Sequence, residues 1–364
     1  MMNKKTFTFV ITEQLNKPVG GYKVVFEYCN YLASKGNAIN LIYDYEFALK
    51  RHNKLPTFVK KIFYFMKYKG KISWFFFHKN VQTKRVWKVV DKTIPDSDFV
   101  FATALETSFV VQKLSSCKGV KCYFIQGYEN WNCTDEHVLS SYNLGLNNFA
   151  VSTWLQKIVE NASNKHCFLL PNGIDLDSFA CRTEYMNRKK HSISLMYSIS
   201  PNKGFIYGFE CVKKLKALYP DLTVDMFGIE PWHNEGYDWI DYHLCASETE
   251  LCDIFNKNRV YICSSLEEGF GLTGIESMAC GSVLVSTNTK GVLEYAKHNY
   301  NSLLCPSGDV DALIANSINA LENDILACNL SKNGQETVNS KFNIINSYKM
   351  LDSFIDSLEA LKHD

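Results

Sequence analysis

The chain has 364 residues, of which 46% are hydrophobic and 21% charged, and its formal net charge is +1. This length is too great for one ordinary core and favours two domains of about 150–180 residues each. The composition is that of a soluble globular protein, and a charge so close to zero identifies no class of partner by itself.

The cysteines and the N-terminus bear on the compartment. The thirteen cysteines are an odd number without a C-x-x-C pair, which argues against a disulfide framework and predicts reduced thiols in the cytoplasm. The opening MMNKKTFTFVIT runs directly into an expected strand, so we predict no secretory signal. No run of about 18 uncharged apolar residues is present, which predicts that no helix spans a membrane.

The first half of the chain alternates between strand and helix patterns. A strand over 6–12, a loop over 16–21, a helix over 22–36 and a strand over 38–44 form a unit that calls for a parallel sheet. Gly20 and Gly21 lie in that loop, where a glycine pair before a helix can present amides to a phosphate, although a simple turn is an equal reading. Further strands are expected at 98–103, 121–127 and 147–152, and a polar stretch over 181–192 is interpreted as a linker.

The segment 47–92 combines basic and aromatic residues. It holds thirteen Lys or Arg and a single acid, Asp91, with aromatic residues such as Phe58, Phe63 and Trp74 interleaved. This mixture suits the interface of an anionic bilayer, although a solvated basic face over core aromatics is the structural alternative. Since no nucleic-acid-binding module is recognisable elsewhere, nucleic acid is not expected as a partner.

The second half repeats the alternation. Strands are expected at 193–200, 222–228, 261–265 and 281–288, helices at 204–220 and 250–258, and a strand followed by a helix within 301–324. The last part of the chain, roughly 342–361, is expected to be helical.

Residues 264–281, SSLEEGFGLTGIESMACG, are the most informative stretch. An apolar strand end leads into a loop that contains Gly269 and Gly271, and a helix is predicted from about Thr273 with Gly281 as its stop. Glu268 then lies at the strand-to-helix turn and Glu276 about one turn inside the helix. Glycine amides before a helix N-terminus bind anions, and the two carboxylates can accept hydrogen bonds from sugar hydroxyls. The pattern therefore favours a nucleotide-sugar site over a helix that merely begins with acids.

This stretch resembles the donor-site signature of retaining glycosyltransferases of the GT-B fold, family 4, in which E-G-F-G-L is followed by a Glu eight positions after the first. PNGID (171–175) and NKG (202–204) resemble further segments of that family, and Asn288, Thr289, Gly291 and Glu294 resemble the stretch that closes over the donor. The resemblance implies an α/β protein with two Rossmann-like domains of parallel sheets facing a cleft. Residues 1–180 would be the acceptor domain, 190–342 the nucleotide-sugar domain, and 343–364 a helix that returns to the first domain.

The resemblance also implies roles for individual residues. Glu268 and Lys203 would be the catalytic residues, with Glu268 on the sugar hydroxyls and Lys203 on the diphosphate. Glu276 would bind the ribose. The remaining donor contacts would come from Gly20, Gly21, Gly269, Phe270, Gly271, Leu272 and Thr273.

Two departures from the family pattern affect the expected site. Ser198 stands where the family usually has an Arg, five residues before Lys203, and no His follows the expected strand 121–127. Gln126 or Glu129 would then orient the acceptor, although this loop also reads as a structural plug. No Asp-x-Asp motif stands in a suitable loop, so we predict that no metal or other cofactor is needed.

The sequence thus predicts a retaining glycosyltransferase that moves a sugar from a nucleotide-diphosphate sugar to a glycan or lipid-linked acceptor in surface polysaccharide biosynthesis. We expect it in the cytoplasm, with peripheral attachment to the inner face of the membrane through 47–92. The alternatives are another activity on the same fold, such as an epimerase or phosphorylase, and a scaffold that binds without turnover. The missing dinucleotide fingerprint disfavours an oxidoreductase.

Overall fold

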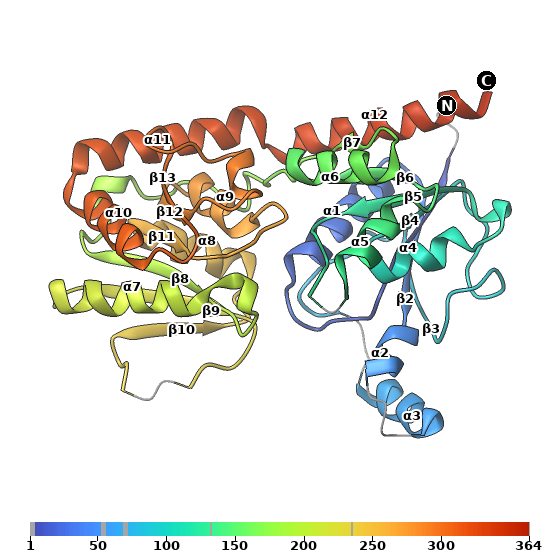
Figure 1. The fold of residues 1–364 in the computed structure, drawn as a ribbon, viewed down its shortest axis with the longest axis horizontal. Coiled ribbons are helices and arrows are strands. Elements are labelled where there is room, and N and C mark those ends of the chain that lie inside the picture. The colour runs from blue at the N-terminus through green and yellow to red at the C-terminus, as the bar shows by residue number, and fades with distance from the viewer. Residues whose placement is uncertain (1–3, 52–55, 68–71, 132, 234–235, 364) are drawn as a thin grey trace. The chain divides into compact units, whose positions relative to one another are not determined.

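The computed structural model describes residues 4–51, 56–67, 72–131, 133–233 and 236–363. The chain divides into two compact units. The first unit comprises residues 1–170 together with 351–364, and the second comprises residues 171–350. Each unit is a parallel sheet with helices on both faces (Figure 1).

The first unit contains a sheet in the order β3-β2-β1-β4-β5-β6-β7, and every adjacent pair is parallel. Its central strands read as nearly continuous apolar runs because helices cover both faces. Phe9 stacks on Phe101 and Phe124 on Phe149, each pair with ring centroids 4.6 Å apart, so aromatic contacts between neighbouring strands fill much of this core. The strands are β1 (Thr6–Ile11), β2 (Ala38–Asp44), β3 (Val81–Val86), β4 (Phe99–Ala102), β5 (Val120–Ile125), β6 (Asn147–Ala150) and β7 (Phe168–Leu169). The helices are α1 (Gly20–Ser34), α2 (Glu46–Arg51), α3 (Thr57–Lys67), α4 (Leu105–Gln112), α5 (Asp135–Tyr142) and α6 (Thr153–Ser163).

The second unit repeats this architecture with a sheet in the order β10-β9-β8-β11-β12-β13, again fully parallel. Helix α7 packs beside α10, and α9 packs against α8 and α11. The strands are β8 (Ser192–Tyr197), β9 (Thr223–Gly228), β10 (Ile240–Leu244), β11 (Val260–Cys263), β12 (Val283–Thr287) and β13 (Ser302–Cys305). The helices are α7 (Phe205–Leu218), α8 (Glu248–Lys257), α9 (Leu272–Ala279), α10 (Val310–Glu322) and α11 (Asp324–Lys341).

The last helix, α12 (Ile344–His363), begins in the second unit and continues into the first. Within the first unit, Asp352 accepts a hydrogen bond from Tyr31 at 2.6 Å and pairs with Lys35 at 2.8 Å. Phe354 packs on Phe149 with ring centroids 4.8 Å apart. The C-terminal part of the chain is therefore an integral part of the N-terminal unit.

Three local expectations from the sequence are wrong. Gly20 and Gly21 do not belong to a loop before the first helix, because α1 begins at Gly20, directly after the extended residue Val19. The stretch 181–192 lies within the second unit, where the Arg188 guanidinium is buried and donates to the carbonyl oxygens of Phe255, Asn258 and Cys280. Strand β3 was not expected, because its exposed residues QTKR lack the apolar pattern of a buried strand.

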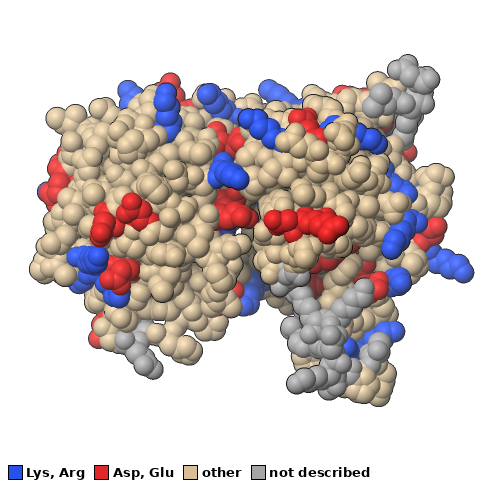
Figure 2. All heavy atoms as spheres, viewed as in Figure 1, with Lys and Arg blue, Asp and Glu red and all other residues tan. Residues whose placement is uncertain are grey.

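No helix within the described ranges has the length and the apolar run that crossing a bilayer requires. On the face shown in Figure 2, basic and acidic side chains form small separate groups rather than one field of a single sign.

Candidate functional site

The strand order of each sheet defines where a ligand can bind. In the second unit the order reverses between β8 and β11, and in open α/β sheets ligands bind outside the carboxyl ends of the strands at such a point. Lys203 lies in the short 3-10 helix (Pro201–Lys203) after β8, and Glu268 lies in the loop after β11. The topology therefore brings together two predicted residues that are 65 positions apart in the sequence.

Lys203 and Glu268 form the central ion pair of this site. The Lys203 ammonium donates to both carboxylate oxygens of Glu268, each at 2.8 Å. Ser265 donates a third hydrogen bond to Glu268 Oε1 at 2.7 Å, so the carboxylate is held from two sides. The Glu268 side chain is 8% exposed and that of Lys203 is 34% exposed. An ammonium has three donors, so Lys203 can also reach a ligand from its exposed side.

The charge state of this pair follows from its surroundings. Burial lowers the pKa of Lys203, but the charge and the hydrogen bonds of Glu268 outweigh it and hold the pKa of Lys203 above its ordinary value. The site therefore presents a permanent cation next to a carboxylate, which suits a ligand with an anionic group beside hydroxyl groups.

The loop after Glu268 leads into α9 as the sequence predicts. Gly271 has φ +92° and precedes the helix, which begins at Leu272 and ends before Gly281 with φ +80°. Leu272 and Thr273 are half-buried in the first turn, where helix amides have no intrahelical partner. The Tyr261 hydroxyl donates to Thr273 Oγ1 at 2.8 Å and fixes that side chain.

Two of the predicted donor residues are more buried than a loop position suggests. The Phe270 ring is 3% exposed and packs on Tyr295 and Phe342, so only the backbone of Phe270 can take part in binding a ligand. Glu276 is 4% exposed, one turn inside α9, as its spacing from Glu268 predicts. Gly269 is half-buried beside Glu268.

Ser198, which stands where the family usually has an Arg, belongs to a local turn. Its hydroxyl accepts a hydrogen bond from the Ser200 amide at 3.2 Å. Asp175 of PNGID is similarly local, since it accepts from the Asp177 amide at 3.0 Å and the Ser178 hydroxyl at 2.9 Å. Both side chains are thus occupied in shaping their own loops.

The predicted residues of the first unit gather at the corresponding reversal of its sheet, between β1 and β4. Gly20 is exposed at the start of α1, and a Cβ placed on Gly21 would lie 3.4 Å from the Gln126 side chain. Gln126 follows β5 and is half-buried. Gly21 and Gln126 are therefore neighbours, and the first-turn amides of α1 lie close to the Gln126 amide group.

Glu129 has a structural partner that the sequence did not reveal. Its carboxylate accepts a hydrogen bond from the Leu105 amide at 2.7 Å, at the first turn of α4. Burial raises the pKa of Glu129 to about 7, the Leu105 amide lowers it, and the nearby charge of Glu106 raises it. The plug reading of this loop thus has a concrete contact, while Gln126 keeps the position next to α1.

The raised pKa makes the stability of the first unit depend on pH. Between the ordinary value of 4.5 and about 7, the unfolded chain releases the Glu129 proton while the folded unit keeps it, so stability falls as pH rises. We expect Glu129→Gln, which stays neutral, to stabilise the unit by up to about 3 kcal/mol at pH near 8 and by almost nothing near pH 4. Denaturant unfolding at several pH values measures this, with Glu136→Gln at an exposed position as the control. A gain independent of pH would contradict it.

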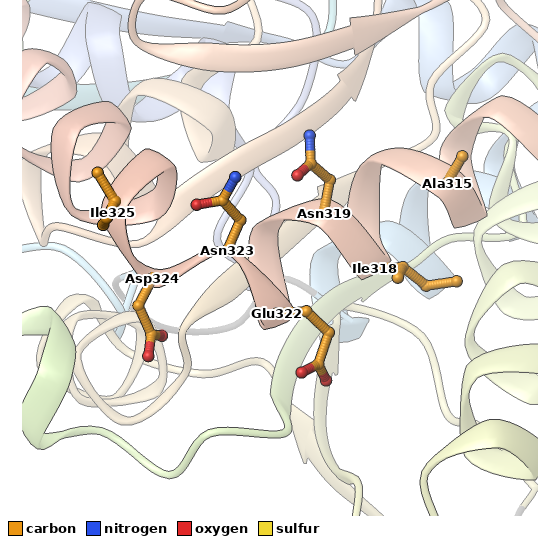
Figure 3. Close-up of a pocket in the computed structure, with 7 residues that line it drawn as sticks. All are labelled: Ala315, Ile318, Asn319, Glu322, Asn323, Asp324 and Ile325. Carbon is orange, nitrogen blue, oxygen red and sulfur yellow. The ribbon is translucent and has the colours of Figure 1, made fainter.

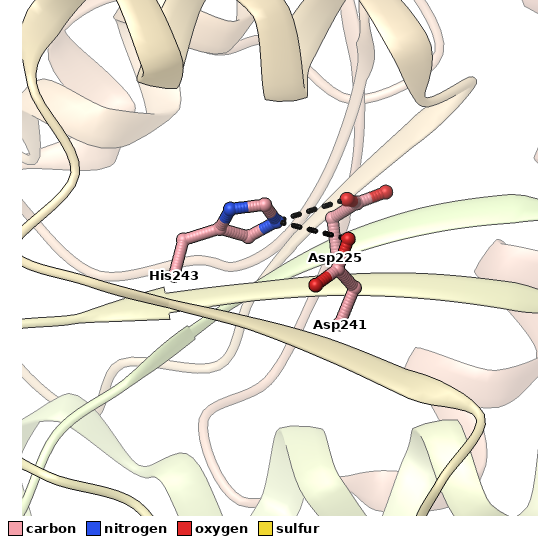
Figure 4. A group of neighbouring side chains, drawn as sticks. All are labelled: Asp225, Asp241 and His243. Atoms are coloured by element: carbon pink, nitrogen blue, oxygen red, sulfur yellow. Dashed lines mark hydrogen bonds and ion pairs between the residues drawn. The ribbon is translucent and has the colours of Figure 1, made fainter.

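A cluster of Asp225, Asp241 and His243 has the composition of a metal site (Figure 4). Asp225 Oδ1, however, already accepts from Lys257 at 2.8 Å and lies 3.1 Å from His243 Nε2, while Oδ2 accepts from Asn258 at 2.9 Å. The Lys257 ammonium supplies the positive charge beside this buried carboxylate. The cluster therefore ties β9, β10 and α8 together, and its arrangement is that of an ion-pair network.

A separate pocket of about 560 Å³ lies where α10 meets α11 (Figure 3). Two of its acids are already paired, because Glu322 binds Lys190 and Asp324 binds Arg259. None of the predicted site residues lines this pocket. Its lining residues are Ala315, Ile318, Asn319, Glu322, Asn323, Asp324 and Ile325.

Comparison with known proteins identifies the class of the second unit. Residues 184–337 match the family model described as glycosyl transferases group 1, so this part of the chain is a glycosyl transferases group 1 domain. The predicted family resemblance is confirmed at this level.

Curated relatives match over short stretches. The chain is 25% identical over 109 residues to N-acetyl-alpha-D-glucosaminyl L-malate synthase of Bacillus anthracis, which covers 29% of each protein. It is 25% identical over 104 residues to N,N'-diacetylbacillosaminyl-diphospho-undecaprenol alpha-1,3-N-acetylgalactosaminyltransferase of Campylobacter jejuni, which covers 28% of each. The chain thus matches less than a third of the length of these relatives.

Solved structures are similar over almost the whole chain. Sucrose-phosphate synthase from Thermosynechococcus elongatus has a TM-score of 0.72 at 16% identity, with 98% of this chain and 100% of that one covered. HepE of Anabaena, in complex with UDP and glucose, also has a TM-score of 0.72, at 13% identity, with 97% and 100% covered. The predicted GT-B fold is confirmed.

Proposed function

We propose that this protein is a retaining glycosyltransferase that transfers a sugar from a nucleotide-diphosphate sugar to a glycan or lipid-linked acceptor in surface polysaccharide biosynthesis. The observation that carries the proposal is the Lys203–Glu268 pair at the point where the sheet order reverses, beside the N-terminus of α9. A cation and helix amides suit a diphosphate, and a held carboxylate suits sugar hydroxyls. The family of the second unit and the UDP and glucose bound by HepE support the same class of ligand.

In this proposal each group has a stated task. Lys203 and the amides of residues 269–273 stabilise the negative charge that develops on the departing diphosphate. Glu268 accepts hydrogen bonds from the transferred sugar and Glu276 from the ribose. The first-turn amides of α1 at Gly20 and Gly21 add donors to the diphosphate, and Gln126 orients the acceptor. We further propose that the reaction needs no metal ion, because Lys203 supplies the cation.

The proposal is tested by thermal unfolding of the protein with a panel of nucleotide sugars, including UDP-glucose, UDP-N-acetylglucosamine and GDP-mannose. A ligand that binds the folded state raises the melting temperature by mass action, so we expect one donor to do so, with and without a chelator. No shift with any member of the panel would contradict the proposal. Binding without hydrolysis or transfer would support a scaffold instead.

We also propose that the first unit docks on an anionic membrane from the cytoplasmic side through α3. Five apolar side chains of this helix are exposed at positions spaced along one face, Phe58, Val59, Ile62, Phe63 and Met66. Exposed basic residues follow in sequence at Lys79, Lys84, Arg85, Lys88 and Lys92. Several basic or aromatic residues of the predicted segment, Lys54, Tyr68, Lys69 and Lys71, lie outside the described residues. An apolar face beside basic residues suits the headgroup region of a bilayer, and the lipid-linked acceptor named for the Campylobacter relative supports this location.

Replacing both Phe58 and Met66 by serine is expected to weaken binding to vesicles of phosphatidylcholine and phosphatidylglycerol by at least about tenfold, because two large apolar side chains would no longer leave water. Vesicle sedimentation measures this. Ile325→Ser, at a side chain that is 80% exposed in the second unit, is the matched control. Equal binding of the double variant and the wild-type protein would contradict docking through α3.

A further inference from the structure

Tyr295 holds the loop that begins α9. It follows the short 3-10 helix Val292–Glu294 and is 4% exposed. Its hydroxyl donates to the Gly271 carbonyl oxygen at 2.7 Å, and its ring packs on Phe270 with centroids 5.4 Å apart. The hydroxyl and the ring thus contact two successive residues of the loop.

This contact sets the direction of a peptide group. The Gly271 carbonyl also accepts from the Gly274 amide at 3.1 Å, so two donors hold the same oxygen. Because the peptide unit is planar and trans, a carbonyl fixed toward Tyr295 makes the N–H of Leu272 point the opposite way. Leu272 is the first residue of α9, where amides have no intrahelical partner. The Tyr295 hydroxyl therefore determines where this free amide points.

The rest of the same segment also packs against the loop backbone. A Cβ placed on Gly291 would lie 2.5 Å from the Glu268 carbonyl oxygen and 2.7 Å from the Gly269 carbonyl carbon. A Cβ on Gly274 would overlap the Tyr295 hydroxyl. Glycine at these positions lets the segment 291–295 touch the loop directly, which leaves the loop little freedom to turn its peptides.

We propose that Tyr295 is a positioning residue for the nucleoside diphosphate, holding the peptide between Gly271 and Leu272 so that its amide is aimed at the phosphates. The inference rests on the proposed function, because it assigns the diphosphate to this loop. Burial raises the pKa of Tyr295, so the hydroxyl stays protonated and remains a donor to Gly271. A phenylalanine in its place would keep the ring packing and lose the hydrogen bond.

The test compares Tyr295→Phe with Tyr185→Phe. Tyr185 is a matched control because it is buried in the same unit and its hydroxyl donates to the Ala320 carbonyl oxygen at 2.8 Å. Both variants lose one hydroxyl-to-carbonyl hydrogen bond. Calorimetric titration with UDP, ADP and GDP should show about threefold to tenfold weaker binding of the preferred diphosphate to Tyr295→Phe, and unchanged binding to Tyr185→Phe.

Hydrogen exchange of peptides covering 268–276, without any ligand, separates this inference from the proposed function. We expect faster exchange in Tyr295→Phe alone. If the loop loosens but wild-type protein binds no diphosphate, the proposed function fails and the diphosphate-positioning role fails with it. Equal diphosphate affinity in wild type and Tyr295→Phe would overturn the inference and leave the proposed function standing.

A second variant checks the geometry independently. Gly274→Ala should lower the melting temperature in the wild-type background, where the new methyl group overlaps the Tyr295 hydroxyl, and should be tolerated together with Tyr295→Phe, which removes that oxygen. Additive effects of the two substitutions would mean that the hydroxyl does not lie against the loop, and would overturn the inference.

Discussion

Replacing Glu268 by glutamine is expected to lower the rate of sugar transfer by about a hundredfold to a thousandfold, the usual effect of removing one preorganised electrostatic contact. Glutamine has the same shape but no charge, so it neither balances the Lys203 ammonium, now 2.8 Å from both oxygens, nor accepts strong hydrogen bonds from sugar hydroxyls. Steady-state transfer from the donor identified by thermal unfolding measures the change. Rates close to wild type would exclude Glu268 from the reaction.

The control for this variant is Glu210→Gln. Glu210 also forms an ion pair with a lysine, Lys213 at 2.6 Å, but on the exposed surface of α7, where such pairs contribute little. It should leave transfer unchanged. The melting temperature of Glu268→Gln should stay near that of the wild-type protein, since glutamine can still accept from Ser265 and Lys203 keeps access to water. A collapse in stability would mean that the lost transfer reports unfolding rather than chemistry.

Much of the fold could be predicted because parallel strands buried on both faces are written as short apolar runs. The predicted strands at β1, β2, β8, β9, β11 and β12 all exist, with boundaries shifted by a few residues. β3 and β10 escaped prediction because they are edge strands whose side chains are largely exposed. The start of α1 was misplaced because Gly20 and Gly21 suggest a loop, whereas glycine is also tolerated in the first turn of a helix.

The site was predictable in its parts but not in its assembly. Glu268 stands out because of its glycine-rich context, and Lys203 because it follows a strand. Their contact depends on the order of strands β8 and β11, which no local pattern reveals. Ser265 and Tyr295 were missed for the same reason, since each acts through a tertiary hydrogen bond. A serine shortly before the acidic loop was the one available signal for Ser265.

The spacing of glycines after Lys203 has a physical cause that the sequence alone did not supply. Gly204 caps α7 with φ +56°, and a Cβ there would overlap the Ser264 carbonyl oxygen. Gly208 lies one turn later on the same face of α7, where a Cβ would be 2.6 Å from Ser264 Oγ. The two glycines thus let the start of α7 touch the end of β11, and this close approach is what brings Lys203 within reach of Glu268.

Gly204→Ala is therefore expected to destabilise the second unit by about 3 kcal/mol or more and to abolish most transfer. The left-handed backbone contributes about 1 kcal/mol of strain, and the overlap with a backbone oxygen that cannot move aside contributes the rest. Gly236→Ala is the matched control, because Gly236 has φ +83° in the same unit with nothing near its Cβ position. It should cost only the backbone strain and leave transfer unchanged. Thermal unfolding and transfer assays decide the matter: equal effects of the two alanines would show that strain alone, and not the contact between α7 and β11, makes Gly204 necessary.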